Sequence, residues 1–101
     1  MSIRTELDAD LQKLTIAIDG RFDFSAHKDF RESYEELEAK PVSYLIDMTD
    51  AQYIDSSALG MLLLLRDHAG GDSADVAIVN CNPDVKKILT ISNFDQLFTI
   101  H

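Results

Sequence analysis

Two adjacent serines, Ser56 and Ser57, have the best position for chemistry in this sequence. Residues 55–60 read D-S-S-A-L-G and lead directly into an apolar run at 61–65. A polar start followed by apolar residues predicts the N-terminus of a helix, where Asp and Ser are standard capping residues. Helix capping would by itself account for both serines, so a chemical role needs a further signal.

A serine nucleophile is the main catalytic alternative, and the sequence does not favour it. The hydrolase motif G-x-S-x-G is absent, because Ile54 and Ala58 occupy the glycine positions around Ser56. The histidines that could act as a base have no motif context and are expected at the surface; they are His27, His68 and His101. We therefore expect no enzymatic activity and no catalytic residues.

A metal site of the receiver-domain type is a second alternative, because Asp47, Asp50 and Asp55 follow one predicted strand. Such a site also needs an acidic pair at the end of an earlier strand, and Asp19 and Asp23 are the acids available there. These aspartates are instead expected in loops. The segment 70–73 (G-G-D-S) has no following Lys-Ser/Thr and is not a phosphate-binding loop. No metal or cofactor is predicted.

Charge and composition restrict the partners. The chain of 101 residues has eighteen acidic and nine basic side chains, a net charge of −9. Few cations argue against nucleic-acid binding and against adsorption to anionic lipid, so protein partners are expected. Residues 1–6 do not resemble a signal peptide, and the apolar run 61–65 is far shorter than the ~20 residues of a membrane span. With Cys81 as the single cysteine, there is no internal disulfide or cysteine-based zinc site, and a reducing cytoplasm is expected.

Alternating strand and helix signals predict one α/β domain over residues 1–101. Leu14, Ile16 and Ile18 alternate with polar or small residues, which is typical of a half-buried strand. Strands are predicted at 3–8, 11–19, 42–48, 76–79 and 98–100. Helices are predicted at 26–39, at 56–69 and from 83 to about 93.

The helix limits come from capping residues and helix breakers. Ser25 is the predicted N-cap of the first helix, and Pro41 lies beyond its end. Gly70 closes the second helix, while Asn82 caps the third with Pro83 at its first position. The second helix is apolar nearly all round, which predicts burial on most sides. Gly60 within it indicates either close approach of another backbone or a merely tolerated glycine.

Three segments resemble one known family. The D-S-S-A-L-G segment at 55–60 matches the D-S-S-G/A-L-G signature of the STAS domain, named for sulfate transporters and anti-sigma factor antagonists. G-R-F-D at 20–23 resembles the family's G-x-hydrophobic-D segment, and N-P-D-V at 82–85 resembles the opening of its third helix. The matches occur in order and cover most of the chain. Ala58 departs from the glycine found in many members and leaves the serines intact.

The predicted elements have the order β-β-α-β-α-β-α-β, and the resemblance implies a mixed sheet with the helices largely on one side. It also implies an anti-sigma factor antagonist that sequesters an anti-sigma factor and frees a sigma factor. The family's first serine, here Ser56, is phosphorylated by an anti-sigma factor with serine kinase activity, and a serine phosphatase reverses the modification. The expected partner-binding surface is made of Asp23, Asp55, Ser56, Ser57, Phe22, Phe24 and Met61.

A second reading within the same family stays open. STAS domains also occur as non-enzymatic subunits of lipid or anion transport complexes. Single-domain versions of that kind often lack the phosphorylatable serine, which this sequence keeps at Ser56. The antagonist reading is therefore preferred.

Overall fold

A five-stranded mixed sheet forms the centre of the protein. The computed structural model describes residues 2–35, 37 and 41–101. In the sheet order β1-β2-β3-β4-β5, β1 runs antiparallel to β2 and the remaining neighbours are parallel. The strands are β1 (Ser2–Asp8), β2 (Lys13–Phe22), β3 (Ser43–Ile54), β4 (Val76–Val79) and β5 (Thr99–Ile100).

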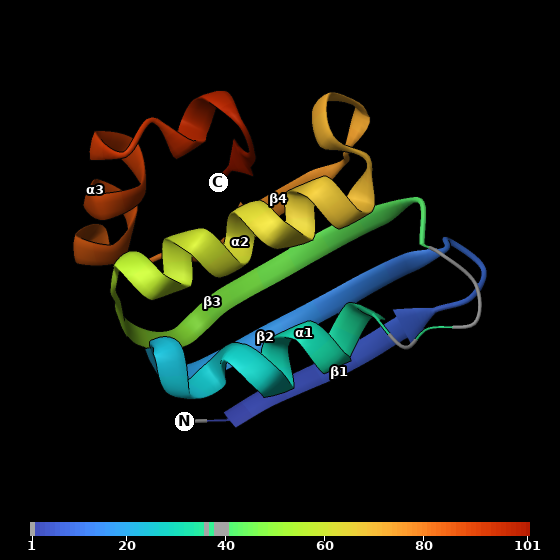
Figure 1. Ribbon diagram of the computed structural model, residues 1–101, viewed down its shortest axis with the longest axis horizontal. Coiled ribbons are helices and arrows are strands. Elements are labelled where there is room, and N and C mark those ends of the chain that lie inside the picture. Colours follow the sequence, from blue (N-terminus) through green and yellow to red (C-terminus); the bar gives the residue numbers. More distant parts are fainter. Residues whose placement is uncertain (1, 36, 38–40) are drawn as a thin grey trace.

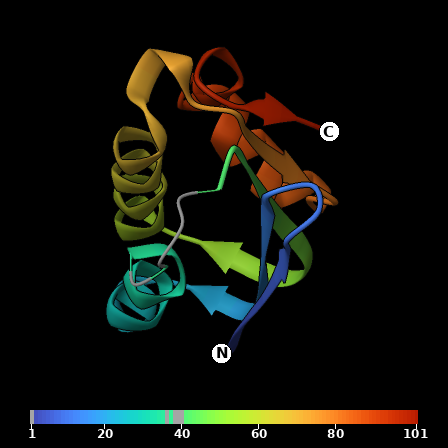
Figure 2. The same cartoon turned by 90° about the vertical axis from the view of Figure 1, so that its right-hand side faces the viewer.

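Helices cover one face of this sheet. The α-helices are α1 (His27–Glu35), α2 (Ser56–Ala69) and α3 (Pro83–Ile91), with 3₁₀ turns at Phe24–Ala26, Gly71–Ser73 and Phe94–Gln96. Helices α1 and α2 lie side by side over the same face, and α3 packs against β3 (Figures 1 and 2). This confirms the predicted α/β fold with its helices largely on one side.

Alternation along the strands separates a buried face from an open one. In β2 the apolar residues Leu14, Ile16 and Ile18 are buried beneath the helices, as predicted from their spacing. Ile46 of β3 and Ile78 of β4 continue the same layer. The intervening side chains of β2 and β3 are half-buried and lie on the opposite face of the sheet.

Strand β3 contains two irregularities against β2. Ala17 pairs with Asp47, whereas Asp19 pairs with Asp50, so β3 has one extra residue there. A second extra residue occurs between the pairs that involve Gly20 and Arg21. Gly20 has φ of 86°, a conformation that costs glycine little. Burial in β3 accordingly changes from every second to every third residue, with Met48, Ala51 and Ile54 in the core.

Two of the predicted strands have different limits in the structure. The strand expected at 42–48 runs from Ser43 to Ile54, and the strand expected at 11–19 runs from Lys13 to Phe22. The polar residues Thr49 and Asp50, which follow Met48, resemble a loop in sequence, but strand pairing with β2 continues past them. The strands predicted at 3–8, 76–79 and 98–100 are found within one residue at each limit.

The first helix also begins differently from the prediction. Asp23, not Ser25, is the N-cap, and its side chain accepts the amide hydrogen of Ser25 at 3.0 Å. A 3₁₀ turn follows, and α1 occupies His27–Glu35 rather than 26–39. Residues 36 and 38–40 of the predicted helix lie outside the described residues. Asn82 is the N-cap of α3 and Pro83 is its first residue, as predicted.

Helix α2 has the predicted limits but is less buried than its composition indicates. It spans Ser56–Ala69, with Gly70 as C-cap at φ of 124°. Leu62 and Leu65 are fully buried, whereas Leu63 and Leu64 are 39% and 52% exposed. One apolar strip of α2 therefore faces away from the sheet, and the prediction of burial on most sides is wrong.

Candidate functional site

The ends of β2 and β3 bring two capping aspartates together at one edge of the helical layer. Phe22 and Ile54 are paired as the last residues of their strands, and Asp23 and Asp55 come next in each. The amide of Asp55 donates to the carbonyl of Phe22 at 3.4 Å. Each aspartate caps the helical segment that follows it. The two helical segments therefore begin side by side, directly after the paired ends of β2 and β3.

Ser56 is the first residue of α2 and is exposed. Capping is carried out by Asp55, whose Oδ1 accepts the amide hydrogen of Ala58 at 3.0 Å. Within the described residues the Ser56 hydroxyl makes no hydrogen bond. Ser57 is half-buried at the second position. Ser56 is thus the more exposed of the two serines.

Asp23 is held in its ionised form by its neighbours. The Ser25 hydroxyl donates to its carboxylate, and this hydrogen bond lowers the pKa of Asp23, although partial desolvation opposes it. Arg21 adds a favourable charge, with its Nε 3.7 Å from Oδ2 of Asp23. The Arg21 guanidinium also lies 4.4 Å from the centre of the Tyr53 ring. The sequence analysis did not identify Arg21 or Tyr53.

Two of the residues assigned to the partner surface belong to the core. Phe22 is fully buried and contacts Phe30, with ring centres 5.1 Å apart, and Met61 is 3% exposed. Phe22 continues the buried alternation of β2, and Met61 lies on the same strip of α2 as Leu65. Their assignment to the surface is wrong because the buried periodicity of each element extends to them.

Exposed apolar groups do lie near the serines. Phe24 is 71% exposed and stacks on His27, with ring centres 5.8 Å apart. Gly60 is exposed one helical turn after Ser56, and Leu64 follows one turn later. Apart from the backbone of its own helix and its chain neighbours, no described atom lies within 4 Å of a β-carbon placed on Gly60, so it is not a point of close approach of another backbone. We call Phe24, Ser56, Gly60 and Leu64 the switch surface.

The remaining aspartates do not form a common site. Asp47 lies on the open face and accepts hydrogen bonds from the Thr49 hydroxyl at 2.6 Å and from Asn80 at 3.3 Å. Asp50 pairs with Arg4 at 3.6 Å and, like Asp47, lies inside β3, whereas the predicted strand ended before Asp50. Across the described part of the chain, no three potential ligands are close enough together to hold a metal ion.

Other features add no chemistry to the site. Cys81 is a half-buried free thiol whose pKa is raised by burial. Among the described residues, the helices are all too short or too polar to cross a bilayer.

The protein is a small α/β domain with an exposed serine and exposed apolar residues at one end of its helical layer. The chain belongs to the STAS domain family, whose model matches residues 3–101. A STAS-domain containing protein of Pseudomonas aeruginosa is 59% identical over 100 residues, which are 99% of each chain.

Two solved structures have the same fold. Phosphorylated SpoIIAA, a cell fate determinant of Bacillus, aligns with a TM-score of 0.69 and 17% identity over 99% of this chain and 91% of that one. The STAS domain of a SulP transporter from Vibrio cholerae aligns with a TM-score of 0.68 and 17% identity, covering 95% and 77%. At such identities these likenesses establish the fold and leave function open.

Proposed function

We propose that this protein is an anti-sigma factor antagonist whose binding is controlled by phosphorylation of Ser56. Unmodified, it sequesters an anti-sigma factor and so frees a sigma factor to direct transcription. It acts in the cytoplasm as a binding module, and a serine kinase and a serine phosphatase act on it. The antagonist is not itself a catalyst and makes no direct contact with DNA.

The exposed Ser56 hydroxyl carries this proposal. A kinase must reach the acceptor oxygen, and Ser56 is exposed while its neighbour Asp55 forms the helix cap. Removing the hydroxyl, or adding a phosphate to it, leaves the Asp55–Ala58 hydrogen bond in place. The acceptor can therefore change its charge without losing the contact that starts α2.

A phosphate at this position is compatible with the fold. Phosphorylation adds about 1.5 to 2 negative charges and three strong acceptor oxygens. The free amides and positive end of α2 favour such a group by roughly 0.3–1 kcal/mol. Because Ser56 is exposed, the phosphate also stays hydrated, and its addition should not unfold the domain.

The same phosphate is unfavourable at a docked interface. Phe24, Gly60 and Leu64 offer apolar contact around Ser56. A partner that covers them would remove water from the phosphate, and desolvation of an unpaired dianion is costly. Asp55 adds a further negative charge next to it. Phosphorylation thus weakens docking while the fold persists.

A comparison of Ser56→Ala with Ser56→Asp tests the proposal. Each variant is used to capture proteins from cells of the same source, and captured proteins are identified by mass spectrometry. We expect an anti-sigma factor with Ser56→Ala and its loss with Ser56→Asp. Ser57→Asp is the matched control, since it adds the same charge one residue later; the two aspartate variants should differ. Identical partner sets from all three variants would reject the switch.

The fold likeness to a SulP transporter domain favours a second candidate, a subunit of a lipid or anion transport complex. The same capture experiment separates the two functions. Recovery of permease or ATPase subunits, independent of the residue at 56, would support the transport function and contradict the antagonist.

A further inference from the structure

Strand β1 is an unprotected edge of the sheet. What this edge can bind is a separate question from the proposed function. Among the described residues, β2 is the only strand that pairs with β1, with pairs from Ser2–Asp19 to Asp8–Lys13, and α1 contacts β1 from the helical face. The backbone groups on its other side have no partner in the described part of the chain. A row of free N–H and C=O groups is a template for another strand. The strand has seven residues, which is long for an unprotected edge.

The sequence of β1 is complementary to itself when reversed. If Thr5 lies opposite the partner's Thr5, antiparallel pairing puts Arg4 opposite the partner's Glu6 and Ile3 opposite the partner's Leu7. Opposite charges and apolar pairs directly across two strands stabilise a sheet. A two-fold axis repeats each pair, so both charge pairs and both apolar pairs form together.

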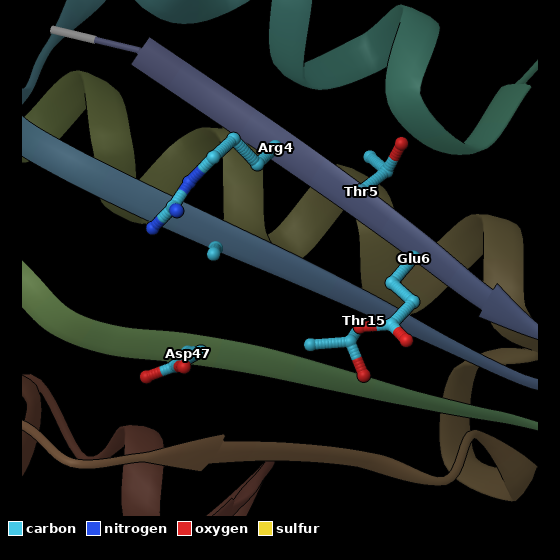
Figure 3. Close-up of a pocket in the computed structure, with 6 residues that line it drawn as sticks. Arg4, Thr5, Glu6, Thr15 and Asp47 are labelled. Atoms are coloured by element: carbon cyan, nitrogen blue, oxygen red, sulfur yellow. The ribbon is translucent and has the colours of Figure 1, made fainter.

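The side chains lie on the faces that this pairing needs. Arg4 and Glu6 are exposed on the open face, and Figure 3 shows both beside β2, with Thr15 close to Glu6. Arg4 contacts Asp50 at 3.6 Å, yet its side chain remains 68% exposed and is free to approach a second carboxylate. On the other face Ile3 contacts the core, and Leu7 is 48% exposed.

Neighbouring registers are unfavourable. A shift by one residue places the apolar side chains opposite charged ones, because strand side chains alternate between faces. Centring the pair on residue 4 or residue 6 instead places Arg4 against itself or Glu6 against itself, which repels. Thr5 is thus the centre that satisfies both charge and burial.

We propose that two copies of this protein associate through β1, centred on Thr5, and form one continuous ten-stranded sheet. Helix α2 begins after β3, and β2 separates β3 from the associating edge. The α2 residues of the switch surface, Ser56, Gly60 and Leu64, therefore stay accessible in each copy of the dimer. The dimer and the Ser56 switch are independent properties of the chain.

Charge exchange in the full chain tests the association. Sedimentation velocity over a concentration series should give a monomer–dimer equilibrium for the unmodified sequence. Arg4→Glu and Glu6→Arg should each weaken dimerisation at least about tenfold, because both symmetry-related pairs become repulsive. The double variant Arg4→Glu/Glu6→Arg should return to within about threefold of the original, because its charges are again complementary.

Arg31→Glu is the matched control, since it makes the same change of charge on α1, where Arg31 pairs with Glu35. It should leave the dimer unchanged. Circular dichroism verifies that each variant is folded. A protein that is monomeric at every concentration, or a double variant no better than the single ones, would overturn the proposal.

Cysteine cross-linking tests the register directly. In a Cys81→Ser background, Thr5→Cys places the two thiols opposite each other on the two-fold axis, and mild oxidation should link the copies. Leu7→Cys is the control, because its thiol faces the partner's Ile3 and lies far from its own copy. Equal cross-linking at both positions would contradict the Thr5-centred pairing.

Discussion

Oδ1 of Asp55 lies 3.0 Å from the amide nitrogen of Ala58, and this hydrogen bond closes the first turn of α2. Ser56 lies between them in sequence but takes no part in the contact. Helix initiation and the proposed phosphate acceptance are therefore carried by different side chains.

Removal of the Asp55 cap should destabilise the domain, whereas removal of the Ser56 hydroxyl should not. We expect Asp55→Ala to lower the free energy of unfolding by about 1 kcal/mol, the usual value of an N-cap. Ser56→Ala should stay within about 0.5 kcal/mol, as for other surface changes. Urea unfolding followed by circular dichroism measures both. A larger loss for Ser56→Ala would mean that Ser56 is structural.

The two phenylalanines on either side of Asp23 should behave in opposite ways. Phe22→Ala removes a fully buried ring and should cost about 3–5 kcal/mol of stability. Phe24→Ala removes a ring that is 71% exposed and should leave stability within about 0.5 kcal/mol. On the proposed function, Phe24→Ala should also weaken anti-sigma factor binding about fivefold or more, measured by calorimetry. Unchanged affinity would remove Phe24 from the switch surface.

Gly60→Ala should stabilise the protein and impair its binding. Alanine at this helical position meets no atom within 4 Å and should raise the free energy of unfolding by about 0.8–1 kcal/mol. Its methyl group would also hold a docked partner away from the switch surface, so affinity should fall. Gly70→Ala is the control, because φ of 124° at Gly70 makes any β-carbon strained and the variant should be less stable.

Tyr44 should be replaceable by phenylalanine without loss. Its Oη is buried and has no hydrogen-bond partner in the described part of the chain, and burial raises the pKa of this phenol. An unpaired buried hydroxyl is unfavourable, so Tyr44→Phe should raise the free energy of unfolding by about 1 kcal/mol. A loss of that size in urea unfolding would show that Oη has a bonding partner in solution.

Asp47 should contribute to the acid sensitivity of the fold. The Thr49 hydroxyl bond lowers the folded-state pKa of Asp47 below its ordinary value of 3.8. A group with a lowered folded pKa stabilises the fold above its unfolded pKa and loses this contribution as pH falls through the folded value. The stability difference between the original protein and Asp47→Asn should be constant above about pH 5 and disappear below the folded pKa. Urea unfolding midpoints of both proteins, measured at intervals down to about pH 2, test this. A stability difference between the two proteins that grew as the pH fell would contradict the prediction.

Much of the fold could be predicted from short-range pattern. The limits of α2 and the start of α3 follow from Asp55, Gly70 and the Asn82–Pro83 pair, which act on the residues beside them. The end of β3 could not be predicted in this way. Its polar residues Thr49 and Asp50 resemble a loop, and pairing with β2 through two extra residues keeps them in the sheet.

The candidate site was predictable where it depends on local sequence. Asp23, Asp55 and Ser56 were identified from motifs and occupy one end of two neighbouring strands. Phe22 and Met61 were misplaced because their burial depends on which face of the element meets the core. The Arg21–Tyr53 contact could not be predicted, since it requires the register between β2 and β3 that the extra residues set.

The two extra residues of β3 make the segment between Asp47 and Ile54 tolerant of changes in length. Each bulge takes up one extra residue locally, and pairing with β2 resumes after it with the same side facing the core. A descendant that lost one of these residues could keep the Phe22–Ile54 pair with one bulge fewer, so the start of α2 would stay in place. Insertions and deletions in β3 should therefore gather at the bulges and be rare between Ser43 and Asp47, where every residue has a regular partner in β2.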